Sequence, residues 1–335
     1  MNGLNPEHRA VSIAIDAMGG DGAPGVILDA IDLALTQSPD LHLQLVGPTK
    51  TLESARQPHW GERVFFQHAD HVLPADVNAV AAIRKGRGSS LWNAIDLLER
   101  QQVDAVVSGG STGALMALSR QKLGMLPGVE RPALMAALPS TARHVWMLDL
   151  GANINVDAPR LLEFAQLGSV AVQVLEDRHP KIGLLNIGSE PGKGPDVLRQ
   201  AAALIEADSR LDYTGFVEAD QVFAGQVDLV VCDGFAGNIL LKSAEGAVRL
   251  MFKGLRDQFS GSLSGLVAKR GLKRLHDSLD PARHNGAPML GVRGTVIKSH
   301  GGACARGFAR AIGLAELEVR RDLINRLDQQ LWSQD

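Results

Sequence analysis

The sequence has little cysteine, few aromatic residues and no long apolar run. The two cysteines, Cys232 and Cys304, have no metal-ligand spacing and cannot form a disulfide framework, which predicts a reducing cytoplasm. No segment approaches the run of about 20 apolar residues that spans a bilayer, and the N-terminal stretch MNGLNPEHRA lacks the apolar core of a signal peptide. We therefore expect a cytoplasmic protein that is neither exported nor integral to a membrane.

Charge and motifs exclude further classes. The chain has 34 Lys and Arg against 37 Asp and Glu, a net charge of −3, whereas a general nucleic-acid binder is normally strongly basic. The sequence contains no HxxxH or paired-cysteine metal motif, and no Ser-His-Asp or Cys-His arrangement of useful spacing. We expect no nucleic-acid partner, no metal and no cofactor.

Glycine and short apolar runs are abundant. With 335 residues the chain can bury one large or two modest cores, and 36 glycines with only 4% aromatic residues suit an α/β protein with many tight turns. Runs rich in Val, Ile and Leu alternate with longer amphipathic segments, and most runs are too continuously apolar to be half-exposed. This pattern predicts a sheet covered by helices on both faces.

The expected elements follow from these runs. The predicted strands are Val11–Asp16, Leu41–Val46, Val64–Gln67, Val103–Ser108, Ala133–Leu138, Val145–Leu150, Lys181–Ile187, Tyr213–Val217, Leu229–Cys232 and Gly294–Ile297. The predicted helices are Pro24–Gln37, Ser90–Gln101, Thr112–Gly124, Pro159–Asp177, Pro195–Ala207, Gly237–Val267, Ala303–Ile312 and Leu314–Trp332. We expect one domain over residues 1–335, with a change of lobe near 139–156 and a protruding helical segment at 246–280.

The stretch Ile182–Gly194 runs from an apolar strand into a glycine-rich turn with one lysine, Lys193, on the side expected to be buried. Glycines let the backbone approach a ligand, a following helix directs free N–H groups at it, and a lysine adds a point charge. The spacing is that of neither the nucleotide P-loop nor the dinucleotide fingerprint. We predict a site for a small oxyanion, with a plain surface turn as the alternative.

Polar, glycine-containing turns follow five of the predicted strands. They are residues 16–21, 108–113, 149–153, 188–194 and 233–238. Because ligands in open α/β sheets bind beyond the carboxyl ends of strands, we expect all five at one edge of the sheet, in a shared site. Four turns bring hydroxyl, amide or carboxylate groups, and only Lys193 brings a full positive charge. This chemistry favours an anion held beside a polarised carbonyl.

Two carboxylates in the first turn, Asp16 and Asp21, would repel an anion that faced them directly. Three roles avoid that repulsion. They cap the helix expected from Pro24, orient neighbouring donors, or bind a cation.

A set of motifs carries a family resemblance. In order along the chain they are DAMGGD at 16–21, SGGSTGAL at 108–115, Arg131-Pro132, LDLGAN at 148–153, GLLNIGSEPGKG at 183–194, VVCDGFAGN at 230–238, GAPMLGVRG from 286 and IKSHG ending at 301. Together they resemble the acyl-ACP:phosphate acyltransferases of the PlsX type, from about Val11 to about Ile312. The resemblance implies transfer of a fatty acyl group from acyl carrier protein to inorganic phosphate, giving an acyl phosphate for phospholipid synthesis.

The resemblance also implies a fold and partners. We expect a homodimer with a Rossmann-like three-layer α/β/α fold, similar to phosphotransacetylases and decarboxylating dehydrogenases. We further expect a membrane glycerol-phosphate acyltransferase as the partner that uses the product.

Site residues are expected from the motifs and from the chemistry. Phosphate is a competent nucleophile, so the enzyme needs to position it and to stabilise the oxyanion. Lys193 is expected to hold the phosphate or oxyanion charge, Asn238 to donate to the carbonyl or else to cap its helix, and His300 to protonate the leaving thiolate. The expected substrate-binding residues are Asp16, Gly19, Gly20, Asp21, Ser111, Thr112, Asn153, Gly192, Gly194, Asp233 and Gly237.

Two features leave alternatives open. Cys232 can be an acyl-accepting thiolate, but a free cysteine after an apolar strand is more often a small buried residue. The segment Gly246–Leu275 has an apolar stripe beside many cations, typical of a core or dimer contact, a membrane-surface helix or a docking face for acidic carrier protein. Its candidate membrane or carrier contacts are Arg249, Lys253, Leu255, Arg256, Phe259 and Leu263.

Two other functional classes are kept beside the resemblance. A nicotinamide-dependent dehydrogenase shares the fold type, but the first turn has no GxGxxG. A non-catalytic scaffold that binds carrier protein and membrane would explain the basic helix, but it would not need five polar strand ends.

Overall fold

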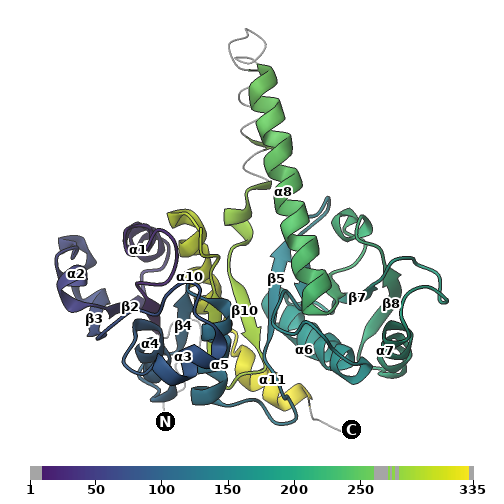
Figure 1. Ribbon diagram of the computed structural model, residues 1–335, viewed down its shortest axis with the longest axis horizontal. Coiled ribbons are helices and arrows are strands. Elements are labelled where there is room, and N and C mark those ends of the chain that lie inside the picture. Colours follow the sequence, from purple (N-terminus) through teal and green to yellow (C-terminus); the bar gives the residue numbers. More distant parts are fainter. Residues whose placement is uncertain (1–9, 260–270, 272–273, 276–278, 332–335) are drawn as a thin grey trace.

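One 11-stranded sheet runs through the protein. The computed structural model describes residues 10–259, 271, 274–275 and 279–331, and within them the strand order is β3-β2-β1-β4-β11-β10-β5-β6-β9-β7-β8 (Figure 1). The strands are β1 (Val11–Asp16), β2 (Leu41–Gly47), β3 (Val64–His68), β4 (Ala105–Ser108), β5 (Ala133–Leu138), β6 (Val145–Leu148), β7 (Lys181–Leu185), β8 (Asp212–Val217), β9 (Leu229–Val231), β10 (Ala287–Leu290) and β11 (Thr295–Lys298).

The strand directions divide the sheet into two halves. Strands β3, β2, β1, β4 and β11 are parallel to one another, and so are β6, β9, β7 and β8. Between them β10 is antiparallel to both β11 and β5, and β5 is antiparallel to β6, so the two halves run in opposite directions. The expectation of five polar strand ends at one edge is therefore wrong: the turns after β1 and β4 lie at one edge, and those after β6, β9 and β7 at the other.

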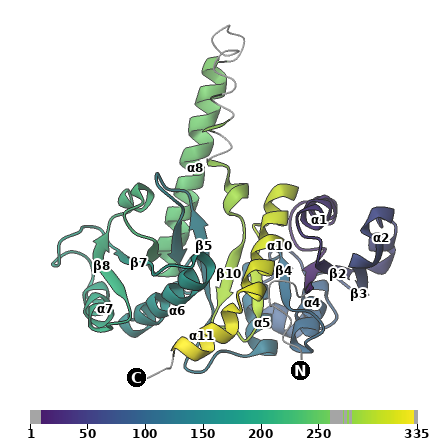
Figure 2. The same cartoon turned by 180° about the vertical axis from the view of Figure 1, so that it is seen from behind.

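Helices cover both faces of the sheet, giving the three layers expected. One face packs against α1 (Gly25–Gln37), α6 (Ala158–Glu176), α7 (Asp196–Ala207), α10 (Ala305–Arg320) and α11 (Leu323–Leu331). The other packs against α3 (Ala79–Lys85), α4 (Ser90–Glu99), α5 (Thr112–Leu123) and the start of α8 (Gly234–Phe259). The short α2 (Thr49–Glu53) packs beside β2 and β3. Figure 2 shows α11 and α6 together across the back of the sheet.

Alternate residues of the strands enter the two cores. Ile13 and Ile15 of β1 pack into one core and Ala14 into the other, and none of the three is exposed to solvent. Val106 and Val107 of β4 divide in the same way. Both faces of these strands are covered, which is why their sequences are continuously apolar, and the predicted α/β fold is confirmed.

Several elements differ from the sequence prediction: strand β10 and the short helices α2 and α3 were not predicted. Strand β10 is four residues long and contains Pro288, which cannot donate a ladder hydrogen bond. Helix α10 was expected to end at Ile312, but it continues through Gly313 to Arg320. The chain turns instead at Asp322, whose φ of 55° is left-handed, before α11 begins.

Helix α8 projects from the body of the molecule (Figures 1 and 2). Its first turns pack into the second core through Ala236, Leu240 and Leu241. With 26 residues it is about 39 Å long. The predicted extension to Val267 lies outside the described residues. No helix in the described ranges is long and apolar enough to cross a membrane.

Candidate functional site

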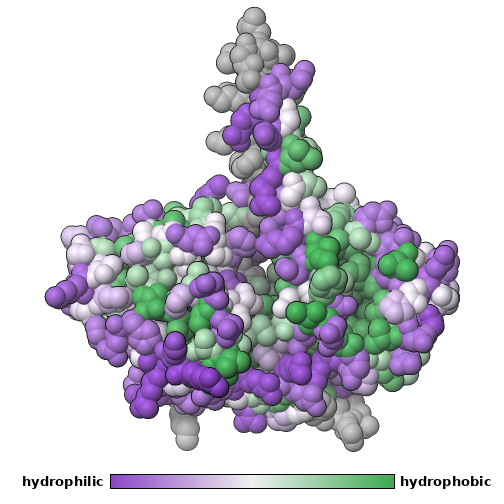
Figure 3. Space-filling view, viewed as in Figure 1, coloured by the Kyte–Doolittle hydropathy of each residue, from purple (hydrophilic) through white to green (hydrophobic). Residues whose placement is uncertain are grey.

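Helix α8 connects the two edges of the sheet. It begins beyond β9, and two turns later Lys242 Nζ lies 3.3 Å from Nε2 of His300, which follows β11. Asn238 precedes Lys242 by four residues, so both side chains lie on the same face of the helix. Between the two halves the surface is indented near the base of α8 (Figure 3). The Lys242 contact therefore brings the helix face that carries Asn238 close to the His300 turn.

His300 is held by the loop around it. Its backbone N–H donates to Asn285 Oδ1 at 2.9 Å, and its ring Nδ1 accepts from the Gly302 N–H at 3.1 Å. A neutral imidazole has one acceptor nitrogen, so the ring can accept from the Gly302 N–H at Nδ1 or from Lys242 at Nε2, but not from both at once. Partial burial, reinforced by the Lys242 ammonium, lowers the pKa of His300, while Glu245 opposes that shift. The imidazole is therefore neutral at neutral pH, which weakens the predicted role of simple proton donor.

Lys298, the last residue of β11, is a site residue that the sequence prediction missed. Its Nζ donates to Gly109 O at 3.3 Å and to Ser299 O. Burial lowers its pKa to about 8, against the opposing effect of Asp16 and Asp21. The available signal was a lysine ending an otherwise apolar strand, directly before the His300 turn. Lys298 ties the ends of β4 and β11 together.

Asp16 orients donors at the end of β1. Its Oδ2 accepts from Ser108 Oγ at 2.7 Å, and that Oγ accepts from the Gly110 N–H at 3.0 Å. Burial raises the pKa of Asp16, although its hydrogen bonds oppose the shift. A Cβ at Gly19 would lie 2.5 Å from Asp16 Oδ2 and 2.7 Å from Gly110 N, so only glycine allows this approach.

The capping role expected for Asp16 and Asp21 is wrong. Helix α1 has Pro24 at its N-cap and no side-chain capping hydrogen bond. Asp21 is exposed, and its backbone N–H donates to Gly301 O at 2.8 Å. Its carboxylate raises the pKa of both His300 and Lys298, against the larger effect of burial. Gly20, with φ of 120°, makes the turn that brings Asp21 to the His300 loop.

At the other edge, Lys193 lies in the turn after β7. Because β7 pairs with β9, this turn lies beside the start of α8. Lys193 is exposed, contrary to the buried orientation expected, and no ion pair is formed by its ammonium among the described residues. Asn186 Nδ2 donates to Lys193 O at 3.1 Å, and Gly194 has a left-handed φ of 79° where a Cβ would strike Asn186. Gly192 is open to solvent.

The start of α8 settles the capping alternative for Asn238. Asp233 Oδ1 accepts from the Ala236 N–H at 2.8 Å, so Asp233 is the capping residue. Asn238 lies inside the helix with an exposed side chain, next to Gly151. The alternative that Asn238 caps its helix is therefore wrong. Gly237 packs against Asp149 O, where a Cβ would clash.

Other predicted ligands are engaged inside the protein. Asn153 is buried, and its Nδ2 donates to Pro132 O at 2.9 Å and to Asp149 Oδ2 at 3.1 Å. Ser111 caps α5, and its hydroxyl donates to Val77 O at 2.9 Å. Thr112 is the first residue of α5 and is half-buried. The geometry favours bracing roles for Asn153 and Ser111.

Cys232 is a buried residue of the second core. Its Sγ donates to Asp149 O at 3.4 Å, and burial raises its pKa well above the ordinary value. A thiol that resists ionisation is a poor nucleophile. The geometry favours the core role that was expected over an acyl-accepting thiolate.

The predicted contact residues on α8 are only partly described. Arg249, Lys253 and Arg256 are exposed, and Leu255 is half-buried. Phe259 ends the described part of the helix, and Leu263 lies outside the described residues. Leu250 and Met251 lie within the segment Gly246–Leu275 that was predicted to carry an apolar stripe, and they are 73% and 40% exposed.

Comparison with known sequences is consistent with this geometry. The sequence model of a family described as "Fatty acid synthesis protein" matches residues 11–326. A relative from Alkalilimnicola ehrlichii named "Phosphate acyltransferase" is 43% identical over 333 residues, covering 97% of each chain. A relative of the same name from Pseudomonas putida is 45% identical over 326 residues, covering 95% of this chain and 97% of its own.

Solved structures share the fold. A phosphotransacetylase from Streptococcus pyogenes has a TM-score of 0.61 at 19% identity, with 94% of each chain covered. A 4-hydroxythreonine-4-phosphate dehydrogenase from Klebsiella pneumoniae has a TM-score of 0.55 at 16% identity, with 93% of this chain and 100% of that chain covered. At such low identity these similarities show the fold alone, and the fold accommodates both acyl transfer and dehydrogenation.

Proposed function

The chain belongs to the fatty acid synthesis protein family and is an acyltransferase, and we propose that it transfers a fatty acyl group from acyl carrier protein to inorganic phosphate. The product is an acyl phosphate for phospholipid synthesis. The observation that supports this most directly is the contact of Lys242 of α8 with His300, with Asn238 one turn earlier on the same helix. A lysine, an amide and an imidazole on neighbouring elements can together hold a dianionic nucleophile and the thioester carbonyl that it attacks.

Phosphate is held by charge and attacks directly. Lys193 supplies an exposed positive charge beside the start of α8, and Asn238 presents an amide on the helix face that leads to Lys242. Lys193 neutralises phosphate or the developing oxyanion, and the Asn238 amide donates to the thioester carbonyl oxygen. One phosphate oxygen bonds to the carbonyl carbon and the carbon–sulfur bond breaks.

The proton balance gives His300 a relay role. Hydrogen phosphate loses its proton when it becomes an acyl phosphate, and the departing thiolate gains one. In the tautomer with Nε2 unprotonated, a neutral His300 accepts the proton from phosphate at Nε2 and passes it to sulfur. A lowered pKa keeps His300 neutral before the reaction, so the ring can accept a proton and then release it. A permanent imidazolium could only donate.

The decisive experiment is acyl-phosphate formation by the purified protein. Acyl carrier protein charged with a fatty acid is mixed with protein and phosphate, the product is trapped with hydroxylamine, and released carrier thiol is counted. We expect both signals to require phosphate and to appear in equal amounts. If the folded protein releases no carrier thiol in the presence of phosphate, the proposal is excluded.

A nicotinamide dehydrogenase and a carrier scaffold are the alternatives. The fold neighbours include a dehydrogenase, but the curated relatives named above are acyltransferases over nearly the whole chain. NAD is expected to leave the rate of acyl-phosphate formation unchanged in this assay. In a separate thermal-melting measurement, NAD is expected to leave the melting temperature of the protein unchanged. A scaffold would bind carrier protein without releasing its thiol.

The cellular setting is part of the proposal. We place the enzyme in the cytoplasm as a homodimer that associates peripherally with the membrane and delivers its product to a membrane glycerol-phosphate acyltransferase. The feature that supports membrane contact is α8, which projects from the body with apolar and polar side chains on different sides (Figure 3).

A further inference from the structure

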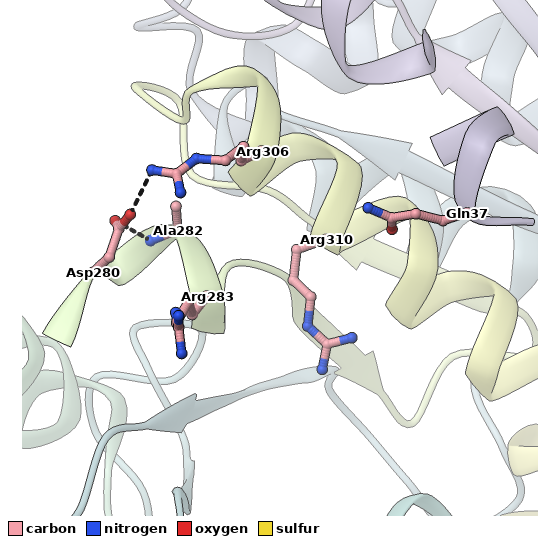
Figure 4. Close-up of a pocket in the computed structure, with 6 residues that line it drawn as sticks. All are labelled: Gln37, Asp280, Ala282, Arg283, Arg306 and Arg310. Atoms are coloured by element: carbon pink, nitrogen blue, oxygen red, sulfur yellow. Dashed lines mark hydrogen bonds and ion pairs between the residues drawn. The ribbon is translucent and has the colours of Figure 1, made fainter. Parts of the chain in front are cut away.

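Three arginines gather in a surface pocket beside the reaction site. The pocket is lined by Gln37, Asp280, Ala282, Arg283, Arg306 and Arg310 (Figure 4). Gln37 ends α1, Arg306 and Arg310 belong to α10, and the others belong to or adjoin the short 3₁₀ helix Pro281–His284. The pocket is thus made where three segments distant in sequence meet.

The pocket has an excess of positive charge. Its one carboxylate, Asp280, is fully engaged: Oδ2 lies 3.0 Å from Arg306 Nη2, and Oδ1 accepts from the Ala282 N–H at 3.0 Å. Arg283 and Arg310 are exposed and form no ion pair with any carboxylate in the described ranges. In Figure 4 their guanidinium groups point in a common direction, away from Asp280. Two guanidinium groups without a carboxylate partner among the described residues form an anion-binding surface.

The field of this pocket reaches the neighbouring His284. Burial, together with His144, Arg310 and Arg283, lowers the pKa of His284 to about 4. The ring therefore does not add a charge of its own at neutral pH. The positive charge of the pocket rests on the arginines.

The pocket is connected to His300 by Asn285. The Asn285 Nδ2 donates to Ser299 Oγ and to Gly307 O, each at 2.8 Å, while its Oδ1 accepts from the His300 N–H at 2.9 Å. Asn285 directly follows the 3₁₀ helix, and Gly307 lies in α10 beside Arg306. A partner bound at the arginines would therefore be fixed close to the loop that holds His300.

We propose that Arg283, Arg306 and Arg310 form the docking surface for the acidic carrier protein that delivers the acyl thioester. This rests on the proposed function, because a protein-bound donor needs contacts outside the reaction site while its thioester reaches in. Guanidinium groups recognise carboxylates with paired hydrogen bonds, and opposite charge speeds encounter. Docking here assigns carrier recognition to the body of the enzyme and leaves the projecting part of α8 for another contact.

The test is a double charge reversal, Arg283→Glu with Arg310→Glu. Binding of fluorescently labelled acyl carrier protein is measured by anisotropy, and turnover is measured with acyl carrier protein and with the same acyl group on pantetheine. We expect carrier binding to weaken by about tenfold or more, and KM for the carrier to rise likewise. Turnover with acyl-pantetheine and KM for phosphate stay unchanged.

A matched control reverses exposed arginines elsewhere, Arg84→Glu on α3 with Arg326→Glu on α11. This control has the same net charge change and is expected to bind carrier protein as the unmodified enzyme does. Equal losses in both double variants would show a general charge effect, and unchanged carrier binding in the first would place docking elsewhere; either result overturns the proposal. Binding without turnover in the unmodified enzyme would instead contradict the proposed function while leaving the docking surface intact.

Discussion

Lys242 Nζ of α8 lies 3.3 Å from His300 Nε2, and this contact joins the two oppositely running halves of the sheet. Lys242 also pairs with Glu245 at 3.0 Å, so the lysine stands between a carboxylate and an imidazole. The charge of a residue on the projecting helix is thereby coupled to the protonation of the loop after β11.

Replacing Lys242 with Met is expected to raise the pKa of His300. The ammonium disfavours the imidazolium, so its removal favours protonation, whereas Glu245→Gln removes a favourable charge and lowers the pKa further. Both shifts are measured by NMR titration of the His300 ring. Identical titrations in the two variants and the unmodified protein would contradict the electrostatic coupling.

Lys193→Ala is expected to reduce acyl transfer with little effect on folding. The side chain is exposed and forms no ion pair in the described part of the chain, so the melting temperature changes little. Loss of a charge at the oxyanion costs about 2–4 kcal/mol of transition-state stabilisation, or about 30- to 1000-fold in kcat/KM. Lys193→Arg is the control that keeps the charge, and near-normal turnover of the alanine variant would end the assignment.

Asn238 variants separate catalysis from helix stability. A carboxylate in the second turn of α8 interacts favourably with the helix dipole, so Asn238→Asp should stabilise by a few tenths of a kcal/mol or be neutral. The same change replaces an amide donor by a negative charge next to the developing oxyanion, so it should lower kcat more than Asn238→Ala does. Activity that follows stability across the two variants would remove Asn238 from the reaction.

Sequence reasoning located most strands but not the relation between them. Strands β1 and β4 are buried on both faces, as Ile13–Ile15 and Val106–Val107 show. Strands buried in this way have continuously apolar sequences, which can be recognised without a structure. Strand β10 left no such run because Pro288 interrupts it, and β10 is one of the two strands that reverse the sheet. Without it, the polar turns were placed at a single edge.

The site was predicted in part for a similar reason. Motifs drew attention to Lys193, Asn238 and His300, because each stands in a polar turn after a strand. Lys242 lies eight residues beyond the start of α8 at Gly234, and only the path of that helix across the sheet brings it to His300. Such a contact depends on tertiary structure and has no local pattern.

Cys232→Ser is expected to retain acyl transfer. The serine hydroxyl can donate to Asp149 O as the thiol does, so the change costs about 1 kcal/mol of stability. Iodoacetamide should modify the exposed Cys304 and spare Cys232 in the native enzyme, and Cys304→Ser should remove the labelling. An acyl group found on Cys232 by intact mass, after mixing with charged carrier protein in the absence of phosphate, would overturn direct attack by phosphate.

The exposed apolar residues of α8 are expected to hold the protein on an anionic bilayer. Leu250 and Met251 lie beside the exposed cations Arg249 and Lys253. Each inserted apolar side chain contributes about 1–3 kcal/mol and each cation near anionic lipid about 1 kcal/mol, so a few of each suffice for reversible binding. The double variant Leu250→Glu with Met251→Glu should keep acyl transfer in solution and no longer sediment with anionic liposomes.

The control for this variant places the same two glutamates on another exposed helix. Val80 and Ile83 of α3 are 60% and 46% exposed, so Val80→Glu with Ile83→Glu adds equal charge without touching α8. It should sediment with liposomes as the unmodified protein does. Light scattering of the α8 variant distinguishes the remaining possibility: if it dissociates into smaller particles, the stripe on α8 is a contact between copies of the chain, and the membrane assignment is wrong.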